Sequence, residues 1–237
     1  MKAIILAAGI GSRLGLEDIP KPMYKIQGKP ILEHNILLLK KHGIKDIFIN
    51  LYYMGDVIKN YFRDGSNWQA NIRYSPEDEL LGTSGAVKNL EAFWNDEPFF
   101  VVYGDNYSDV DLTKMLAFHR FNKVPVTVAL FNPEETTSSQ VAGGFVTIDG
   151  NNKIMSFQEG IKNHDNGYVN AGVYVVEREI LDMIPLKAPS DFGKDVFPKI
   201  LEQKLVLKGY ETKEFVIAID TKEALMEAEK FSRQEIQ

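Results

Sequence analysis

Short apolar runs alternate with amphipathic stretches along most of the sequence. The apolar run at residues 3–8 leads into a glycine-rich turn, and the stretch at residues 30–43 places Leu32, Ile36 and Leu39 on one helical stripe. Such alternation is typical of a parallel or mixed β-sheet covered by helices. The sequence therefore predicts an α/β fold.

The same pattern gives an expected order of elements. We expect strands at residues 3–8, 45–51, 72–74, 99–103, 124–130, 144–148, 154–157, 169–176, 205–209 and 214–219. We expect helices at residues 30–43, 56–62, 83–93, 112–121, 177–184, 192–203 and 221–233. The strand-rich middle predicts a small inserted β ribbon or lid. Because the sequence has no internal repeat and no obvious linker, we expect a single domain over residues 1–237.

The composition excludes several classes of function. Hydrophobic residues make up 44% of the chain, and no run approaches the ~18 consecutive apolar residues of a membrane helix. The absence of cysteine rules out disulfides, a thiolate nucleophile and cysteine-ligated zinc, and it fits a cytoplasmic protein. A net charge of -6 argues against a general nucleic-acid surface. Catalysis would have to use oxygen and nitrogen groups on small-molecule partners.

The turn after the first strand reads LAAGIGSRLG at residues 6–15. Its glycines approximate the spacing of a dinucleotide-binding loop, and a plain surface turn is the other interpretation. A dinucleotide site also needs an acidic residue about 20 residues further on, at the end of the second strand. That strand instead ends near Asn50, after a long loop and a helix. Arg13 in the turn and Lys21 beyond it add positive charge, which favours a nucleoside triphosphate.

Asp105 directly follows the buried apolar run at residues 99–103 and Gly104. The end of a parallel strand is the edge at which open α/β sheets bind ligands. A carboxylate there suits Mg²⁺, which takes one or two carboxylates together with waters and substrate phosphates. Simple turn residues at Asp105 and Asn106 are the alternative. Asp220 is the candidate for a second carboxylate ligand, with a helix N-cap as its alternative role.

Several motifs, in this order, resemble those of one known family. They are LAAGIGSRL and PKPM at residues 6–14 and 20–23, EDELLGTSGAV at 77–87, GDN at 104–106 and YVNAGVY at 168–174. Together they are similar to the motifs of the sugar-1-phosphate nucleotidyltransferases, and the stretches at 104–112 and 191–198 look most like mannose or heptose 1-phosphate guanylyltransferases. The resemblance implies a Rossmann-like mixed sheet flanked by helices, a requirement for Mg²⁺, and a nucleoside triphosphate and a sugar 1-phosphate as substrates.

The resemblance also implies roles for the nucleotide-side residues. The backbone near Gly9 and Gly82 would hold the base and ribose, and Glu77 would help to read the base. Arg13 and its neighbours would bind the β- and γ-phosphates, and Lys21 the α-phosphate. The predicted nucleotide-binding residues are Leu6, Ala7, Ala8, Gly9, Gly11, Ser12, Arg13, Lys21, Glu77, Gly82 and Thr83; the predicted catalytic residues are Arg13, Lys21 and Asp105. The alternative for the LGTSG stretch is a turn in which Thr83 or Ser84 caps a helix.

The sugar side matches the family less closely. The predicted sugar-phosphate-binding residues are Asn106, Glu159, Lys162, Asn170, Gly172 and Lys194. Gly160 stands where the family has a lysine that meets the sugar phosphate, so Lys162 or Lys194 is the candidate replacement. An amphipathic surface helix is the alternative role of the segment around Lys194. The predicted metal ligands are Asp105 and Asp220, although the commoner family pattern has its aspartate at the position of Ala218.

Other functions stay open at this point. Uridylyl-, thymidylyl- and cytidylyltransferases share the main motifs, and a non-enzymatic nucleotide-sensing relative would share the fold. An NAD-dependent oxidoreductase is disfavoured by the missing acidic residue. The four histidines show no metal-binding spacing. We expect no nucleic-acid or membrane partner, and a homodimer as the default assembly.

Overall fold

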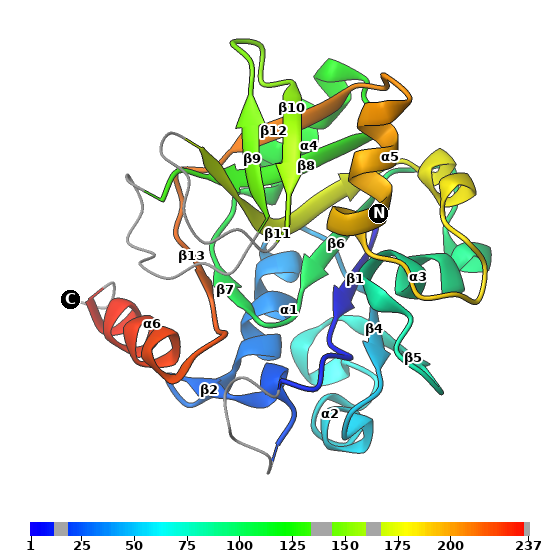
Figure 1. Ribbon diagram of the computed structural model, residues 1–237. Helices are drawn as coiled ribbons and strands as arrows, with labels where there is room; N and C mark the ends of the chain where they lie inside the picture. The colour runs from blue at the N-terminus through cyan, green and yellow to red at the C-terminus, as the bar shows by residue number, and fades with distance from the viewer. Residues whose placement is uncertain (12–18, 134–143, 160–166, 235–237) are drawn as a thin grey trace.

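The computed structural model describes residues 1–11, 19–133, 144–159 and 167–234. Figure 1 shows a mixed sheet flanked by helices. In the described part of the chain this sheet has nine strands, in the order β10-β9-β11-β6-β1-β4-β5, with β8 pairing with β11 and β12 with β8. The strands are β1 (Lys2–Leu6), β4 (Asp46–Leu51), β5 (Asn71–Pro76), β6 (Phe99–Tyr103), β8 (Val126–Phe131), β9 (Phe145–Ile148), β10 (Ile154–Gln158), β11 (Tyr168–Val176) and β12 (Leu207–Glu211). The predicted mixed α/β fold is confirmed.

The helical segments follow the predicted order, but three of them contain 3-10 or π-helical turns in place of α-helical ones. Over the described residues the α-helices are α1 (Ile31–Lys41), α2 (Gly55–Phe62), α3 (Gly82–Asn89), α4 (Leu112–Asn122), α5 (Phe197–Glu202) and α6 (Lys222–Gln234). The end of the helix expected at 83–93 is a 3-10 turn, Glu91–Phe93; the segment at 177–184 is a 3-10 helix, Arg178–Met183; and the segment at 192–203 begins as a π-helix, Phe192–Val196. At the end of α3, the Trp94 indole N–H donates to the Val87 carbonyl at 2.9 Å. In a longer α-helix this carbonyl would accept the N–H of Glu91.

The parallel strands β4, β1 and β6 form the buried centre of the sheet. Ala3, Ile4 and Ile5 of β1 are fully buried. Ile5 belongs to a core cluster with Ile36 of α1, whereas Ile4 belongs to a second cluster with Val87 of α3. A strand covered on both faces needs a continuous apolar run. This is why residues 3–8 lack the alternation of a half-exposed strand.

The expected β ribbon is the antiparallel hairpin of β9 and β10. In Figure 1 this hairpin projects at the top of the molecule. Its strand β9 also pairs with β11 through Phe145 and Val169. The ribbon is therefore an extension of the main sheet, not a detached lid.

A second, small sheet places the C-terminal part of the chain beside the carboxyl end of β6. It consists of β7 (Asn106–Ser108) and β13 (Val216–Ala218), and a short hairpin of β2 (Lys25–Ile26) and β3 (Lys29–Pro30) lies nearby against α6. The Ile219 N–H donates to the Asp105 carbonyl at 3.0 Å. This pairing places the residue that follows, Asp220, beside the end of β6.

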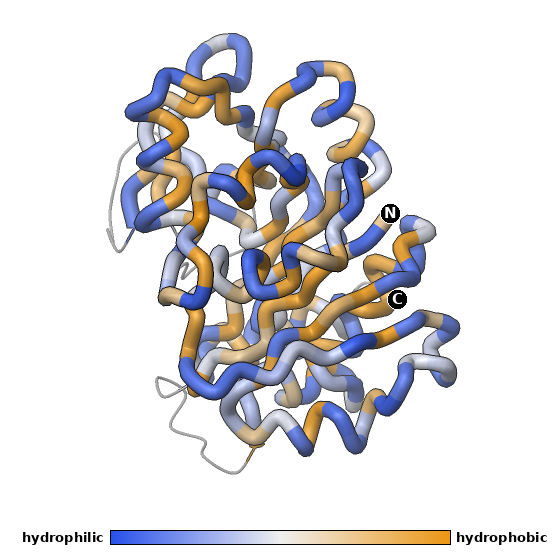
Figure 2. Tube along the Cα trace, turned by 90° about the vertical axis from the view of Figure 1, so that its right-hand side faces the viewer, coloured by the Kyte–Doolittle hydropathy of each residue, from blue (hydrophilic) through white to orange (hydrophobic). Residues whose placement is uncertain are grey.

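The distribution of apolar residues matches this arrangement. Figure 2 shows hydrophobic residues along the strands in the interior and hydrophilic residues on most of the outer turns. Among the residues that the structure describes, no helix combines the length and the apolar character needed to cross a membrane.

Candidate active site

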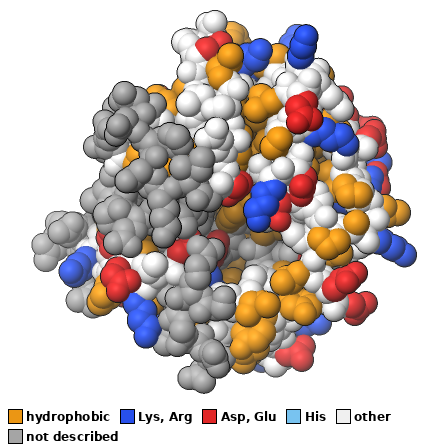
Figure 3. Space-filling model, in the orientation of Figure 1, with side chains coloured by type: hydrophobic (Ala, Val, Ile, Leu, Met, Phe, Trp, Pro, Cys, Tyr) orange, Lys and Arg blue, Asp and Glu red, His pale blue; other side chains and the backbone are white. Residues whose placement is uncertain are grey.

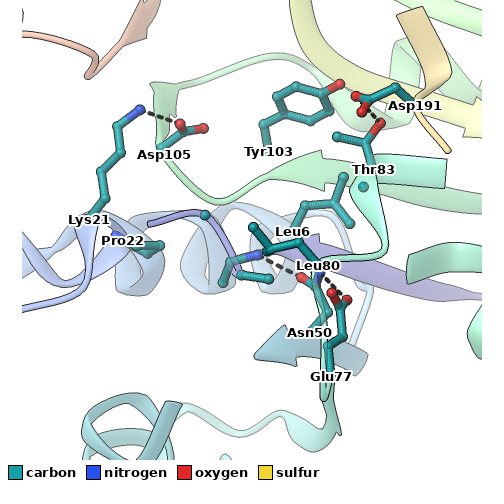
Figure 4. Close-up of a pocket in the computed structure, with 14 residues that line it drawn as sticks. Leu6, Lys21, Pro22, Asn50, Glu77, Leu80, Thr83, Tyr103, Asp105 and Asp191 are labelled. Carbon is teal, nitrogen blue, oxygen red and sulfur yellow. Dashed lines mark hydrogen bonds and ion pairs between the residues drawn. The ribbon is translucent and has the colours of Figure 1, made fainter. Parts of the chain in front are cut away.

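A pocket of about 220 Å³ lies at the carboxyl ends of β1, β4 and β6 (Figure 4). It is lined by Leu6, Ala7, Ala8, Gly9, Lys21, Pro22, Asn50, Glu77, Leu80, Gly82, Thr83, Tyr103, Asp105 and Asp191. In Figure 3 charged and apolar side chains surround a hollow near the centre of this face. The carboxyl edge of the parallel strands is the usual ligand position in open α/β sheets.

Two glycines allow the chain to close around one end of this pocket. A Cβ at Gly104 would lie 2.7 Å from the carbonyl oxygen of Leu6, and the Gly104 N–H donates to that oxygen at 2.9 Å. Gly11 has a φ of +70°, and a Cβ there would lie 2.9 Å from the Cβ of Lys21. These close approaches leave Asp105 and Lys21 facing each other.

Lys21 joins two carboxylates that are far apart in the sequence. Its Nζ donates to Asp105 Oδ2, drawn in Figure 4, and to Asp220 Oδ1 at 2.6 Å. Burial lowers the pKa of Lys21, but the charges of Asp105 and Asp220 outweigh it, so the pKa is raised above its ordinary value. The ammonium group therefore stays charged at neutral pH.

Asp220 does not cap α6. The hydroxyl of Thr221 does so, accepting the Ala224 N–H at 3.1 Å. The N-cap interpretation of Asp220 is therefore wrong, and its carboxylate is directed instead toward the pocket lysine.

The two carboxylates fit a divalent cation. Asp105 and Asp220 converge on the Lys21 ammonium group, so the two carboxylates lie close enough together to share a divalent cation bound beside it. In the described part of the chain no cluster of three or more histidine, cysteine or acidic side chains could hold a metal ion. A site with two carboxylates leaves the remaining positions to waters and ligand oxygens, which is how Mg²⁺ is commonly bound.

Asn50 organises the opposite end of the pocket. Its Oδ1 accepts the Ala7 N–H at 2.7 Å, and its Nδ2 donates to Glu77 Oε1 at 2.8 Å. Glu77 Oε2 accepts the Leu81 N–H at 3.0 Å. Burial raises the pKa of Glu77, and the bonds from Asn50 and Leu81 offset part of this effect. Sequence reasoning did not select Asn50 as a site residue, although a polar residue near the end of an apolar strand was a usable signal.

The start of α3 is held by a distant segment. The carbonyl of Ser190 accepts the N–H groups of Ser84 and Gly85 at 3.0 and 3.1 Å. Gly82 has a φ of +73°, and a Cβ there would lie 2.4 Å from that same oxygen. The helix has no side-chain cap. The alternative interpretation, in which Thr83 or Ser84 caps the helix, is therefore wrong, because a backbone carbonyl accepts the exposed amides.

The hydroxyl of Thr83 is also committed to this segment. Thr83 Oγ1 donates to Asp191 Oδ1 at 3.0 Å and accepts the Phe192 N–H at 2.9 Å. Asp191 and Tyr103 line the pocket next to Thr83, as Figure 4 shows. The sequence motifs did not single out either residue for the site, because their role depends on contacts with residues about 20 to 110 positions away.

The predicted sugar-side residues lie outside the residues that line this pocket. Asn106 Nδ2 donates to the Ala171 carbonyl at 2.8 Å, and Asn170 Oδ1 accepts the Gly172 N–H at 2.9 Å. These bonds fix a bulge in β11, where its register with β8 shifts between residues 170 and 174. Tyr103, which lines the pocket, packs against the bulge: a Cβ at Gly172 would lie 2.9 Å from Tyr103 Cγ.

Glu159 and Lys194 lie near each other on exposed parts of the surface. Partial desolvation, followed by the charge of Asp191, raises the pKa of Glu159, and Lys194 opposes the rise. A Cβ at Gly193 would lie 2.1 Å from Glu159 Oε1, so the Glu159 carboxylate packs directly against the Gly193 backbone. These contacts bring together segments that are more than 30 residues apart in the sequence.

The structure thus brings most predicted residues to two neighbouring regions. After the ligands expected from the sequence, we call the pocket residues Lys21, Asn50, Glu77, Thr83 and Asp105 the nucleotide half, and Asn106, Glu159, Asn170, Gly172 and Lys194 the sugar half. The predicted residues Leu6, Ala7, Ala8, Gly9 and Gly82 also line the pocket, and Gly11 lies against Lys21. Ser12, Arg13 and Lys162 lie outside the described residues.

The fold and the site define a class of protein. It is a Rossmann-like α/β protein whose ligand pocket lies at the carboxyl edge of parallel strands, with a lysine and two carboxylates at one end. The chain belongs to the nucleotidyl transferase family, whose model matches residues 2–235. The resemblance seen in the sequence motifs is confirmed.

Two relatives show how close the chain comes to known enzymes. It is 36% identical over 221 residues to a UTP–glucose-1-phosphate uridylyltransferase of Synechocystis sp., covering 86% of this chain and 56% of the relative. It is 36% identical over 215 residues to the D-glycero-alpha-D-manno-heptose 1-phosphate guanylyltransferase of Campylobacter jejuni, covering 89% of this chain and 92% of the relative. The chain therefore spans little more than half of the first relative and nearly all of the second.

Solved structures agree with this assignment. HddC from Yersinia pseudotuberculosis in complex with GMP-PN superposes with a TM-score of 0.81 at 26% identity, covering 98% of this chain and 99% of that chain. A structure described as a putative glucose-1-phosphate thymidylyltransferase from Bacillus anthracis gives a TM-score of 0.83 at 25% identity, covering 98% and 95%. The same fold thus occurs in relatives named for different nucleotides.

Proposed function

We propose that this protein transfers a nucleoside monophosphate from a nucleoside triphosphate to a sugar 1-phosphate, which yields a nucleotide sugar and pyrophosphate. The observation that carries the proposal is the convergence of Lys21, Asp105 and Asp220 at one end of a pocket at the sheet edge. A cation and two carboxylates in this position suit a phosphate ester that must be oriented and neutralised. Membership of the nucleotidyl transferase family supports the same reaction class.

The nucleoside triphosphate would lie along the nucleotide half. The backbone at Leu6, Ala7, Ala8 and Gly9 and at Gly82 and Thr83 would hold the base and ribose, with Glu77 at the base. Gly11, Ser12 and Arg13 would bind the β- and γ-phosphates. Lys21, whose pKa is raised by its two carboxylate neighbours against the lowering effect of burial, would contact the α-phosphate as a charged group.

In the reaction, an oxygen of the sugar 1-phosphate attacks the α-phosphorus. A new bond forms between that oxygen and the phosphorus, and the bond from the phosphorus to the bridging oxygen of pyrophosphate breaks with its electron pair leaving on pyrophosphate. The attacking phosphate is already anionic near neutral pH, so neither a protein nucleophile nor a general base is needed. Lys21 and Arg13 would lower the barrier by orienting the phosphates and neutralising their charge.

Asp105 and Asp220 would hold Mg²⁺. When bound, the cation would neutralise negative charge on the phosphate oxygens. The two carboxylates would hold the cation at the same end of the pocket as the Lys21 ammonium group.

The sugar 1-phosphate would bind in the sugar half. The Asn106 side chain and the bulge at Asn170 and Gly172 would face the sugar hydroxyls, and Glu159 would accept from them. Lys194, near Glu159, is a candidate for the sugar phosphate, as is Lys162. Because Lys194 is exposed, its charge is available to an incoming ligand.

We favour GTP with a mannose- or heptose-type 1-phosphate as the substrate pair. Guanylyltransferase relatives support this choice, including one of which the chain covers 92%, whereas the uridylyltransferase relative supports UTP as the alternative. The test is a panel of the four nucleoside triphosphates against mannose, heptose and glucose 1-phosphates with Mg²⁺, with released pyrophosphate as the readout. We expect the fastest release with GTP. Binding of a nucleotide without release from any pair would instead indicate a non-enzymatic sensor.

A further inference from the structure

Asn50 lies near the carboxyl end of β4, in the wall of the pocket. Its side chain is buried. Strand β4 lies between β1 and β5, so this position is flanked by the ends of both neighbouring strands. Ala7 directly follows β1, and Glu77 directly follows β5. One side chain therefore reaches the two segments that flank it.

These two partners fix the orientation of the Asn50 amide. The Ala7 N–H is a donor, so it requires the amide oxygen, which accepts it at 2.7 Å. The Nδ2 group then donates to Glu77 Oε1 at 2.8 Å. Flipping the amide would set two donors against each other at Ala7 and two acceptors against each other at Glu77. Asn50 is therefore held in one orientation, which Figure 4 shows.

The carboxylate of Glu77 is held from two sides. Oε1 accepts from Asn50 Nδ2, and Oε2 accepts the Leu81 N–H at 3.0 Å. Each carboxylate oxygen has two lone pairs, so each keeps one for a further donor. Both bonds favour the ionised form, whereas burial raises the pKa of Glu77. Glu77 therefore presents two adjacent acceptors, fixed in position, in the wall of the pocket.

The chemistry of the pocket places a base, not phosphates, beside Glu77. The positive charge of Lys21 lies at the other end, together with Asp105 (Figure 4). The carboxylate of Glu77 would repel a triphosphate, but it can accept from the N–H groups of a base. Leu80 lines the pocket near Glu77 and is partly exposed, so it offers an apolar surface to a flat ring.

The common nucleobases differ in what they offer to two adjacent acceptors. Guanine has two neighbouring donors on one edge, the N1–H and the N2 amino group. Uracil and thymine have one N–H between two carbonyl oxygens, and adenine and cytosine have an amino group beside an acceptor nitrogen. Two parallel bonds to a carboxylate are stronger and more selective than one. A carboxylate held like that of Glu77 therefore matches guanine.

We propose that Asn50 is a positioning residue for nucleobase selection: it holds the Glu77 carboxylate so that both oxygens accept from the donor edge of guanine. Through the Ala7 N–H, the same amide fixes the distance between this carboxylate and the turn after β1. The inference deepens the proposed function and rests on it in one respect, since it assumes that the pocket receives a nucleoside triphosphate.

The test compares the binding of GTP with that of inosine triphosphate, which lacks only the N2 amino group. Both Kd values are measured by calorimetry without a sugar phosphate, so that no transfer takes place, and the Kd of UTP is measured in the same way. In the wild type we expect GTP to bind about tenfold or more tightly than inosine triphosphate, because one charge-assisted hydrogen bond is lost. We expect UTP to bind more weakly than GTP.

Asn50→Asp separates the two contacts of the amide. The new side chain still accepts the Ala7 N–H, but a second carboxylate then faces Glu77. At about pH 7.5 we expect the preference for GTP over inosine triphosphate to fall below about threefold, because the repelled Glu77 carboxylate leaves its position. At about pH 6 the two carboxylates share a proton, which restores a donor to Glu77, and the preference should return. A merely structural role of Asn50 would not follow the pH in this way.

Asn71 provides a matched control. Its Nδ2 donates to Asp46 Oδ1 at 2.8 Å, at the opposite ends of β4 and β5 from the pocket. Asn71→Asp therefore also sets two carboxylates against each other, and it should keep the wild-type preference at both pH values.

Glu77→Gln is a second variant that does not depend on the folding of Asn50→Asp. It replaces one acceptor oxygen with an amide donor, so the preference for GTP over inosine triphosphate should fall below about threefold at both pH values. Thermal unfolding shows whether each variant is folded.

Four results would overturn the inference. They are a wild type that binds inosine triphosphate as tightly as GTP or UTP more tightly; an unchanged preference in Asn50→Asp or in Glu77→Gln; a preference that stays lost in Asn50→Asp at both pH values; and unfolding of both variants. Pyrophosphate release with sugar 1-phosphates is measured separately. Selective binding of GTP without release removes the proposed transfer and leaves the base selection intact, whereas release without this selectivity does the reverse.

Discussion

The nucleotide half and the sugar half are built in different ways. In the nucleotide half, side chains at the ends of buried strands are held by partners from other segments. Asn50 bridges Ala7 and Glu77, and Lys21 joins two carboxylates. In the sugar half, the Asn170 side chain bonds within its own strand and Asn106 bonds the Ala171 carbonyl of that strand, but the two charged residues, Glu159 and Lys194, are exposed.

This difference separates two tasks. Groups fixed by rigid strands keep their positions before a ligand arrives, which is what charge stabilisation in a transition state requires. Exposed groups lose side-chain freedom when a ligand binds, and so they contribute to affinity and selectivity at an entropic cost. We therefore expect substitutions in the nucleotide half to act on turnover, and those in the sugar half to act on KM for the sugar 1-phosphate.

The largest effect is expected for Asp105→Ala. Losing a carboxylate from the proposed cation site should lower kcat by about 10³-fold, because charge stabilisation at the α-phosphate is lost. The measurement is pyrophosphate release over a series of Mg²⁺ concentrations. Asp109→Ala is the control, since Asp109 is an exposed carboxylate paired with Lys41 at 2.7 Å. Near-normal turnover in Asp105→Ala would remove Asp105 from the cation site.

Lys21→Met should lower kcat by about 10²-fold, and Arg13→Ala similarly, because each removes a positive charge from the phosphates. The Lys21 variant also leaves Asp105 and Asp220 facing each other without the ammonium group, which destabilises the fold. Added Mg²⁺ should therefore raise the Tm of this variant more than that of the wild type. Lys25→Met, at an exposed position, is the control. Equal Tm shifts would argue that Mg²⁺ does not bind between the two carboxylates.

A smaller effect is expected in the sugar half. Lys194→Ala should raise KM for the sugar 1-phosphate about tenfold, the usual cost of one charge-assisted hydrogen bond, and change kcat little. Steady-state kinetics with each substrate varied in turn gives the comparison. Lys199→Ala removes another exposed lysine, one that donates to the Met183 carbonyl at 3.1 Å, and should leave both constants unchanged. If Lys194→Ala behaves like this control, the segment is an amphipathic surface helix without a binding role.

The smallest effect concerns the pH dependence of stability. Burial raises the pKa of Glu77, so the folded protein binds this proton more tightly than the unfolded chain does. The contribution of Glu77 to the free energy of unfolding is then fully present below its ordinary pKa and is lost as the pH rises through the folded pKa. The difference in this free energy between the wild type and Glu77→Gln should decrease from about pH 4 to pH 7.

Urea unfolding at several pH values measures this difference. The exposed neighbour Glu79 provides the control, because Glu79→Gln removes a carboxylate without removing a buried one. A difference for Glu77→Gln that rises with pH would show that the hydrogen bonds from Asn50 and Leu81 outweigh burial.

Much of the nucleotide half could be predicted because its residues follow motifs that are continuous in the sequence. The run at residues 3–8 with its glycine turn, and Asp105 after the run at 99–103, show both the strand and the residue that follows it. Asn50, Tyr103 and Asp191 were not predicted. Each is assigned to the pocket by contacts with distant segments, such as Asn50 with Glu77 or Asp191 with Thr83, and no local pattern encodes those contacts.

The sequence by itself determined the α/β class, the family and the positions of Lys21 and Asp105, because apolar periodicity and motif order are local properties of the chain. Only the tertiary structure decided that Asp220 pairs with Lys21, 199 residues away, while Thr221 caps α6. It also decided that the Ser190 carbonyl, and no side chain, caps the start of α3. A buried polar group takes whichever partner the folded chain places within hydrogen-bonding distance, and that choice is made by the path of the backbone in space.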